Sequence, residues 1–180
     1  MRCVVLDIDH TVVHTTSSCT NPAYDLCEAR FQNGDPMTIH IRPHVIEFIQ
    51  YVNSTPGLEI VFWTAGTSEY ARVVVDMLLS RAKVDHVAGV LSRNSATRHS
   101  NGSYIKDLDV VRKMFRTPYV VLIDDDPIHT TCARNRGSVV TVPRFDVSIP
   151  AKREDTFFSL LESEIQARIS LLSYHKYEGS

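Results

Sequence analysis

Near the start of the chain stands the stretch Cys3-Val4-Val5-Leu6-Asp7-Ile8-Asp9-His10-Thr11. Its first half is a short continuous apolar run, which is typical of a strand that is covered on both faces of a parallel sheet. Its second half places two carboxylates and a hydroxyl directly after that run. Because open parallel sheets bind ligands beyond the carboxyl ends of their strands, the stretch predicts an α/β fold with a site at Asp7 and Asp9.

Four further apolar runs predict strands, at residues 58–63, 87–91, 119–123 and 139–142. Helix-like spacing of apolar residues separates these runs. The predicted helices begin at Pro43, at Ser68 (to Ala82), at Asp107 (to Met114) and at Asp126-Pro127 (to Arg134). A last amphipathic helix covers about 154–172 within the C-terminal segment 151–174. Strands that alternate with helices predict a doubly wound, mainly parallel sheet flanked by helices.

Two polar segments interrupt this alternation. Residues 12–42 are polar and irregular until two short apolar segments flank Asn33-Gly34, a dipeptide typical of a β-hairpin turn. Residues 92–106 form a polar loop with Asn101-Gly102 near its end. We therefore expect a single domain over residues 1–180 with a small hairpin insertion at about 15–42.

The composition fits one soluble globular domain of 180 residues, with 43% apolar and 22% charged residues. A net charge of -2 gives no reason to expect direct binding of nucleic acid. Four scattered cysteines without a CxxC pair favour free thiols in a reducing compartment, either nucleus or cytoplasm. No apolar run approaches the roughly 20 residues that span a bilayer, and no secretory leader is evident. The oligomeric state is left open, with a monomer favoured.

Acidic residues also follow the strand predicted at 119–123, where Asp124 and Asp125 lie beside Asp126. Carboxylates that share one edge of a sheet repel each other, and a hard cation with oxygen ligands, most naturally Mg²⁺, relieves that repulsion. An isolated DxD is more often a surface turn, but a second acidic strand end argues for a site. We assign Asp126 to helix capping because Pro127 follows it.

Five segments in order resemble motifs of the haloacid dehalogenase-like phosphatases. More narrowly, they look like the group that dephosphorylates the C-terminal domain of RNA polymerase II, the small CTD phosphatase or NLI-interacting factor-like group. The segments are Leu6-Asp7-Ile8-Asp9-His10-Thr11-Val12-Val13-His14-Thr15, Arg42-Pro43-His44-Val45-Ile46-Glu47-Phe48-Ile49, Phe62-Trp63-Thr64-Ala65-Gly66-Thr67-Ser68-Glu69-Tyr70-Ala71, Tyr104-Ile105-Lys106-Asp107-Leu108 and Val121-Leu122-Ile123-Asp124-Asp125-Asp126-Pro127. In addition, Arg144-Phe145-Asp146 stands where the family often has Trp-Phe-Asp. The matches run over about residues 3–146.

The resemblance implies a Mg²⁺-dependent phosphomonoester hydrolase that acts through an aspartyl phosphate. Asp7 would attack phosphorus, and Asp9 would act as general acid and then as general base. The metal site would take Asp7, the backbone carbonyl of Asp9 and Asp125, with Asp124 either a ligand or an orienting group. Thr11 would brace the loop.

Substrate contacts are implied at Thr64, Ala65 and Lys106, which would hold the oxygens of the transferring phosphoryl group. Arg93 would hold a phosphopeptide or simply be solvated. Further cations could add to a basic rim around the site, namely Arg98, Lys106, Arg112 and Arg116.

Many relatives close the site with a large cap domain, but the insertions here are too short for one. An open site favours phosphoserine or phosphothreonine on a protein. The chain departs from the group at His10, at Arg144 and in the polar stretch 15–19, so the polymerase tail is one option among several. Two alternatives are a capless phosphatase for small phosphate esters or phosphotyrosine, and a catalytically weak binding module of the same fold.

Overall fold

A computed structural model of the chain describes residues 1–17, 21–31, 36–148 and 155–174. Its centre is a five-stranded sheet in the order β10-β9-β1-β5-β6, and every neighbouring pair is parallel. The strands are β1 (Arg2–Asp7), β5 (Leu58–Trp63), β6 (Gly89–Leu91), β9 (Val120–Asp124) and β10 (Val139–Thr141). The predicted doubly wound parallel sheet is confirmed.

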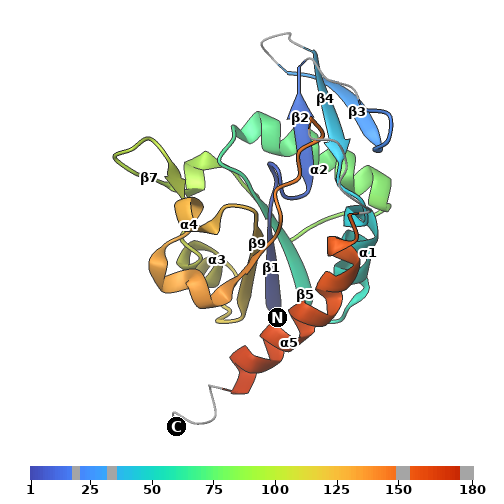
Figure 1. Cartoon of the computed structure of the whole chain (residues 1–180). Helices are drawn as coiled ribbons and strands as arrows, with labels where there is room; N and C mark the ends of the chain where they lie inside the picture. The colour runs from blue at the N-terminus through green and yellow to red at the C-terminus, as the bar shows by residue number, and fades with distance from the viewer. Residues whose placement is uncertain (18–20, 32–35, 149–154, 175–180) are drawn as a thin grey trace.

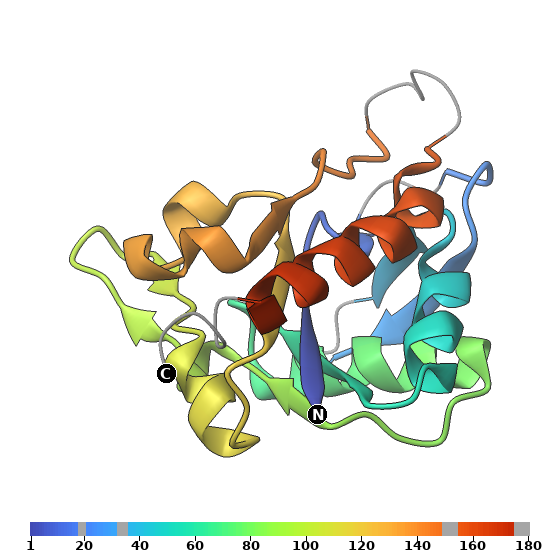
Figure 2. The same ribbon diagram turned by 90° about the horizontal axis from the view of Figure 1, so that it is seen from below.

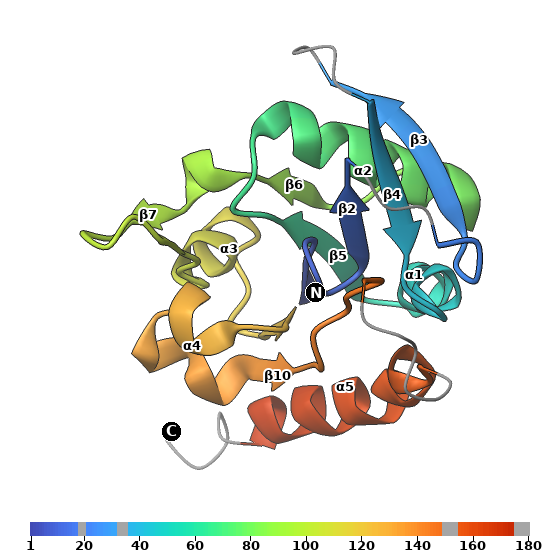
Figure 3. The ribbon, with the colours of Figure 1, turned by 45° about the horizontal axis from the view of Figure 1, so that its top comes forward.

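Helices cover both faces of this sheet (Figure 3). One face carries α1 (Val45–Ser54), α2 (Ser68–Ala82) and α5 (Phe157–Tyr174), and the other carries α3 (Asp109–Met114) and α4 (Pro127–Thr130). Side chains of β1 alternate between the two resulting cores, with Val4 and Leu6 in one and Cys3 and Val5 in the other. This alternation explains why the strand is apolar at every position.

A second, antiparallel sheet stands above the carboxyl ends of β1 and β5 (Figure 1). It contains β2 (Val13–Thr16), β4 (Pro36–Ile41) and β3 (Leu26–Arg30), with β4 in the middle. The expected pairing of two strands on either side of Asn33-Gly34 is confirmed, although the turn itself lies outside the described residues. The expectation that the chain is irregular from residue 12 was wrong, because β2 pairs with β4.

The polar loop 92–106 also has regular structure. It begins with the 3₁₀ turn Arg93–Ser95 and continues into a short hairpin of β7 (Thr97–Arg98) and β8 (Tyr104–Ile105). Gly102 has a φ of 89°, a conformation that suits glycine in a tight turn. This hairpin brings the chain back to the sheet at Lys106.

Two predicted helix starts are displaced. Helix α1 begins at Val45, after His44 in the left-handed region, so Pro43 precedes the helix and is not its first residue. The residue that caps α3 is Leu108, while Asp107 accepts a bond from the backbone N–H of Asp109 at 3.2 Å.

The helix predicted from Asp126 to residue 134 is divided. Helix α4 ends at Thr130, and a 3₁₀ helix over Ala133–Ser138 follows. The Thr130 carbonyl accepts a hydrogen bond from the backbone N–H of Lys106 at 2.6 Å, and Thr131 forms a bridge with Lys106. This pairing draws the backbone out of helical conformation, which the local sequence does not indicate.

The C-terminal helix α5 lies beside α1 (Figure 2). It is fixed at its start by Arg42, whose buried guanidinium binds Asp155 at 2.7 Å and the Pro143 carbonyl at 2.8 Å. No helix among the described residues is long and apolar enough to cross a bilayer. Three of the four cysteines are described, and all three are free thiols.

Candidate active site

The carboxyl end of β1 turns sharply to present Asp7 and Asp9. His10 adopts a φ of 60°, and the backbone N–H groups of Val12 and Val13 both donate to the Ile8 carbonyl. The turn sends the two aspartates to different partners rather than to one point. Asp7 faces the end of β9, and Asp9 faces the end of β5 and the start of α2.

Lys106 is the cationic centre of the site. Its side chain is 1% exposed, and its Nζ donates to Asp7 Oδ1 at 2.5 Å and to Asp124 Oδ2 at 2.7 Å. A buried ammonium needs paired carboxylates of this kind, because an unpaired buried charge is strongly destabilising. Asp7 and Asp124 sustain the charge on Lys106 and raise its pKa, although burial opposes this.

Asp124 and Asp125 occupy different environments. Asp124 accepts bonds from Lys106, from the Thr130 hydroxyl at 3.0 Å and from the backbone N–H of Asp126 at 2.8 Å, so both its oxygens have donors. Asp125 accepts from the buried Thr11 hydroxyl and from Arg144, which is 55% exposed. Thr11 also accepts from the Asp125 backbone N–H, as a bracing residue would.

The acidic cluster fits a divalent cation. One carboxylate oxygen from each of Asp7, Asp124 and Asp125 lies within 4.8 Å of the others. Burial and the neighbouring carboxylates raise the pKa of Asp7 from 3.8 to about 7, despite the opposing effect of Lys106. Negative charge is therefore in excess even with Lys106 present. All-oxygen donors with surplus negative charge suit a hard cation such as Mg²⁺.

Asp9 is held away from that cluster. The Thr64 hydroxyl donates to its Oδ2 at 2.6 Å, and the Tyr70 hydroxyl donates to its Oδ1 at 2.5 Å. Thr64 is fully buried and accepts from the backbone N–H of Gly66 at 2.8 Å. The structure thus brings together Asp9 and Thr64, and Ala65 follows Thr64 in the chain.

Sequence reasoning gave Tyr70 no role in the site, because its position in α2 fits the apolar stripe of that helix. Two signals were available: Tyr70 belongs to the segment from Phe62 to Ala71 that resembles a family motif, and it lies in the first turn of a helix that begins at the carboxyl edge of β5. Residues in such a turn face the ligand edge of the sheet.

Arg93 forms no ion pair with the carboxylates of the described residues. Its backbone N–H donates to the Gly66 carbonyl at 3.1 Å, and its guanidinium lies 5.5 Å from the centroid of the Tyr104 ring. Its Nε is buried and has no partner within the described residues. A role in substrate binding therefore stays a prediction.

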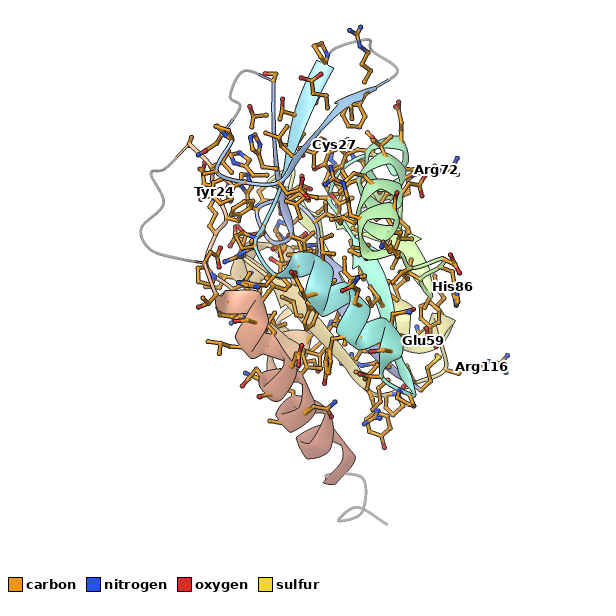
Figure 4. The ribbon with its side chains drawn as sticks, turned by 90° about the vertical axis from the view of Figure 1, so that its right-hand side faces the viewer. Tyr24, Cys27, Glu59, Arg72, His86 and Arg116 are labelled. Carbon is orange, nitrogen blue, oxygen red and sulfur yellow. The ribbon has the colours of Figure 1, made fainter. Side chains whose placement is uncertain are left out.

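The prediction of a basic rim around the site was wrong for two of its residues, Lys106 and Arg116. Lys106 is buried in the site and is not at its edge. Arg116 lies at the end of the molecule opposite the three-stranded sheet (Figure 4). Arg112 is committed to Asp109 and Asn135 at 2.8 and 2.7 Å.

Comparison with known proteins finds relatives along most of the chain. Residues 2–170 match the family described as NLI interacting factor-like phosphatase. The human protein named carboxy-terminal domain RNA polymerase II polypeptide A small phosphatase 1 is 32% identical over 69% of this chain and 45% of its own length. Phosphatase Herzog of Drosophila melanogaster is 30% identical over 70% of this chain and 34% of its own length. The chain thus spans less than half the length of these relatives.

Solved structures agree on the fold. Fcp1, described as an essential RNA polymerase II CTD phosphatase, aligns with 98% of this chain and 50% of its own at a TM-score of 0.60 and 23% identity. A fission yeast Fcp1 variant bound to beryllium fluoride gives a TM-score of 0.60 at 22% identity, over 98% of this chain and 52% of its own. The fold is therefore that of Fcp1, a haloacid dehalogenase-like fold with a five-stranded parallel sheet.

Proposed function

Because the chain belongs to the NLI interacting factor-like phosphatase family, we propose that it hydrolyses phosphate monoesters with Asp7 as the nucleophile. The observation that carries this proposal is the cluster of Asp7, Asp124 and Asp125, in which the buried Lys106 bonds to Asp7 and Asp124. A scaffold that only binds partners has no need for a buried lysine between two buried carboxylates, because such a cluster costs desolvation energy.

The first step transfers the phosphoryl group to the protein. An Asp7 carboxylate oxygen attacks phosphorus as the ester P–O bond breaks, and Asp9 gives its proton to the departing oxygen. Lys106 binds Asp7 Oδ1, and within the described residues Oδ2 has no hydrogen-bond donor, which suits Oδ2 to the attack. Lys106 also offsets the charge of the transferring oxygens.

The second step regenerates Asp7. Water attacks the phosphorus of the aspartyl phosphate, the bond from phosphorus to Asp7 breaks, and Asp9 accepts the proton of the water. Asp7, Asp125 and the backbone carbonyl of Asp9 would hold Mg²⁺, with Asp124 orienting Lys106. A bound Mg²⁺ supplies charge neutralisation, since it polarises the phosphoryl oxygens and lowers the pKa of Asp7.

The substrate we propose is phosphoserine or phosphothreonine on a protein. Among the described residues, the segment 15–42 builds only a three-stranded sheet, and the loop 92–106 only a two-stranded hairpin. Neither forms a large cap that would close over a small metabolite. The relatives named as CTD phosphatases support a protein substrate for this family.

Hydrolysis of p-nitrophenyl phosphate tests the proposed activity. We expect turnover that requires Mg²⁺, stops with EDTA and is lost in Asp7→Asn. Asp76→Asn is the matched control, because Asp76 is an exposed residue of α2 outside the carboxylate cluster. A folded wild-type protein without turnover in Mg²⁺ would refute the proposal and favour a binding module.

A further inference from the structure

Tyr70 contacts the proposed acid–base residue through a hydroxyl group to which the mechanism gives no part. Its hydroxyl donates to Asp9 Oδ1 at 2.5 Å, while the Thr64 hydroxyl donates to Oδ2 at 2.6 Å. We propose that Tyr70 is a positioning residue, which holds the Asp9 carboxyl group where it can protonate the leaving oxygen. This inference rests on the proposed function and adds a residue to its machinery.

The two donors restrict Asp9 in a way that neither could alone. Thr64 follows β5, and Tyr70 lies in the first turn of α2, so the two hydroxyls reach the carboxylate from different elements. Donors on both oxygens fix the plane of the group as well as its position. A misplacement of about 1 Å in a reacting group can cost a factor of about 100 in rate, so this restriction has a catalytic consequence.

Tyr70 is itself firmly placed. Its phenol oxygen lies 2.9 Å from Thr15 Oγ1. Because the single phenol hydrogen is directed at Asp9, Thr15 must be the donor in this second bond. The ring of Phe31 packs against the Tyr70 ring with centroids 5.7 Å apart. A Cβ at Gly66 would come within 2.8 Å of Tyr70 Cδ1, so only glycine leaves room for the ring.

The phenol remains protonated across the pH range of enzyme assays. Burial, and then the negative charge of Asp9, raise the pKa of Tyr70 well above 10. Tyr70 therefore acts as a hydrogen-bond donor and takes no proton from substrate or water. The bonds of the Tyr70 hydroxyl to Asp9 and to Thr15 give the phenol a fixed place, and they are the basis of the positioning role.

Tyr70 also links the three-stranded sheet to the chemistry. Thr15 belongs to β2, and Phe31 directly follows β3. The hydrogen bonds from Thr15 to Tyr70 and from Tyr70 to Asp9 form one continuous chain from the second sheet to the proposed acid. The inserted sheet thus contributes to the rate of leaving-group departure, in addition to any contact with substrate.

Leaving-group dependence distinguishes this role from a structural one. A poor leaving group needs its proton in the transition state, whereas p-nitrophenolate departs without one. We would measure kcat/KM, which reports the first phosphoryl transfer, for a series of para-substituted phenyl phosphates. In Tyr70→Phe, we expect kcat/KM to stay near normal for p-nitrophenyl phosphate and to fall about tenfold for phenyl phosphate. A fall of this size is expected when one hydrogen bond to a charged group is lost.

Two further variants test whether the effect of Tyr70→Phe comes from a folding defect. Thr15→Val removes the donor to Tyr70 without changing the aromatic ring. We expect kcat/KM to fall with increasing leaving-group basicity more steeply than in the wild type, but less steeply than in Tyr70→Phe. Tyr51→Phe is the matched control, because the Tyr51 hydroxyl accepts a bond from Gln166 at 2.8 Å in the contact between α1 and α5, away from the site. Its values should equal those of the wild type across the series.

Each remaining outcome overturns the inference. A uniform loss across all phenyl phosphates in Tyr70→Phe would mean a general structural role. Unchanged phenyl phosphate hydrolysis with a higher KM for phosphopeptides would mean that Tyr70 contacts the substrate. An inactive wild-type protein would remove the proposed function as well, whereas an active wild type with an unaffected Tyr70→Phe variant would remove this inference alone.

Discussion

Asp124 and Asp125 are adjacent in the chain, but their carboxylates face different partners. Asp124 is committed to Lys106, Thr130 and a backbone N–H, while Asp125 is bound by Thr11 and by the exposed Arg144. The pattern Asp-Asp after a strand predicts that both approach the site, but it leaves open which of them binds a metal. Both oxygens of Asp125 also have donors, but the donor to Oδ2 is the 55% exposed Arg144, which a cation can displace. This difference favours Asp125 as the ligand and Asp124 as the group that orients Lys106.

Replacing each carboxylate separately tests this division. We expect Asp125→Asn to weaken Mg²⁺ binding by at least about tenfold, because it removes a charged ligand. Asp124→Asn should change Mg²⁺ affinity much less and lower kcat, because Lys106 loses one partner. Isothermal titration with Mg²⁺, beside steady-state kinetics, separates the two effects. Equal weakening of Mg²⁺ binding in both variants would make Asp124 a direct ligand.

The elements follow the sequence closely where local signals agree with tertiary contacts. Helix α2 spans the predicted residues, and its start is fixed by the Thr67 side chain, which accepts from the backbone N–H of Tyr70. Strand β2 could not be recognised, because its Val-His-Thr-Thr sequence has no apolar alternation and its pairing with β4 is a long-range contact. The division of α4 likewise depends on a bridge to Lys106, which no local pattern encodes.

The contact between Arg42 and α5 is predicted to stabilise the fold strongly. Arg42 is 2% exposed, bonds to two backbone carbonyls and to Asp155, and lies near three phenylalanine rings. Removing a buried guanidinium leaves these acceptors without a partner, so Arg42→Ala should lower the free energy of unfolding by about 3 kcal/mol. Urea denaturation measures the change.

Arg168→Ala is the control for that measurement, since Arg168 on α5 forms a surface pair with Glu164 and one long hydrogen bond of 3.5 Å to the Gly137 carbonyl. Its effect should stay within about 0.5 kcal/mol. A loss in Arg42→Ala no larger than the loss in Arg168→Ala would show that Arg42 does not anchor the helix.

His14 in strand β2 should make the stability of the protein depend on pH. Burial, followed by the charge of His10, lowers the pKa of His14 below 6.5, against the attraction of Asp146. At a pH between the lowered pKa of the folded protein and 6.5, His14 is protonated in the unfolded chain but neutral in the folded protein. This contribution to stability is complete above pH 6.5 and declines as the pH falls below it.

Melting temperatures from pH 8 to pH 5 give the measurement for His14. We expect the wild type to lose stability below pH 6.5 and His14→Gln to lose less, because glutamine keeps an acceptor for the Val147 N–H without titrating. An identical decline in both proteins would exclude His14 as a source of the effect.

At the scale of the whole molecule, strand order explains how much of the site the sequence could predict. β1 lies between β5 and β9, so the aspartates at its end meet Thr64 on one side and Asp124 on the other. Acidic residues at strand ends can be recognised in the sequence, and they predicted that Asp7, Asp124 and Asp125 lie together. They did not predict that Asp9 is bonded to Thr64 and Tyr70 instead. The bond between Arg42 and Asp155, 113 residues apart, could not be predicted from the sequence, because no local pattern relates the two residues.

The open architecture predicts a preference among substrates. We expect kcat/KM for phosphoserine or phosphothreonine in flexible peptides to exceed that for sugar phosphates, because no large cap closes the site among the described residues. A phosphopeptide array and a panel of phosphorylated metabolites, assayed at one Mg²⁺ concentration, make the comparison. Turnover of metabolites with none of phosphopeptides would contradict the proposed substrate class.

The phosphorylated form of the protein gives the most direct test of the role of Asp7. Asp9→Asn should still accept a phosphoryl group from p-nitrophenyl phosphate, whose leaving group needs no acid, but hydrolyse it slowly because the base is missing. After an acid quench and proteolysis, mass spectrometry should find one phosphoryl group on residue 7, and none in the variant that also carries Asp7→Asn. Continued hydrolysis with residue 7 unmodified, or with the phosphoryl group on another residue, would contradict the account.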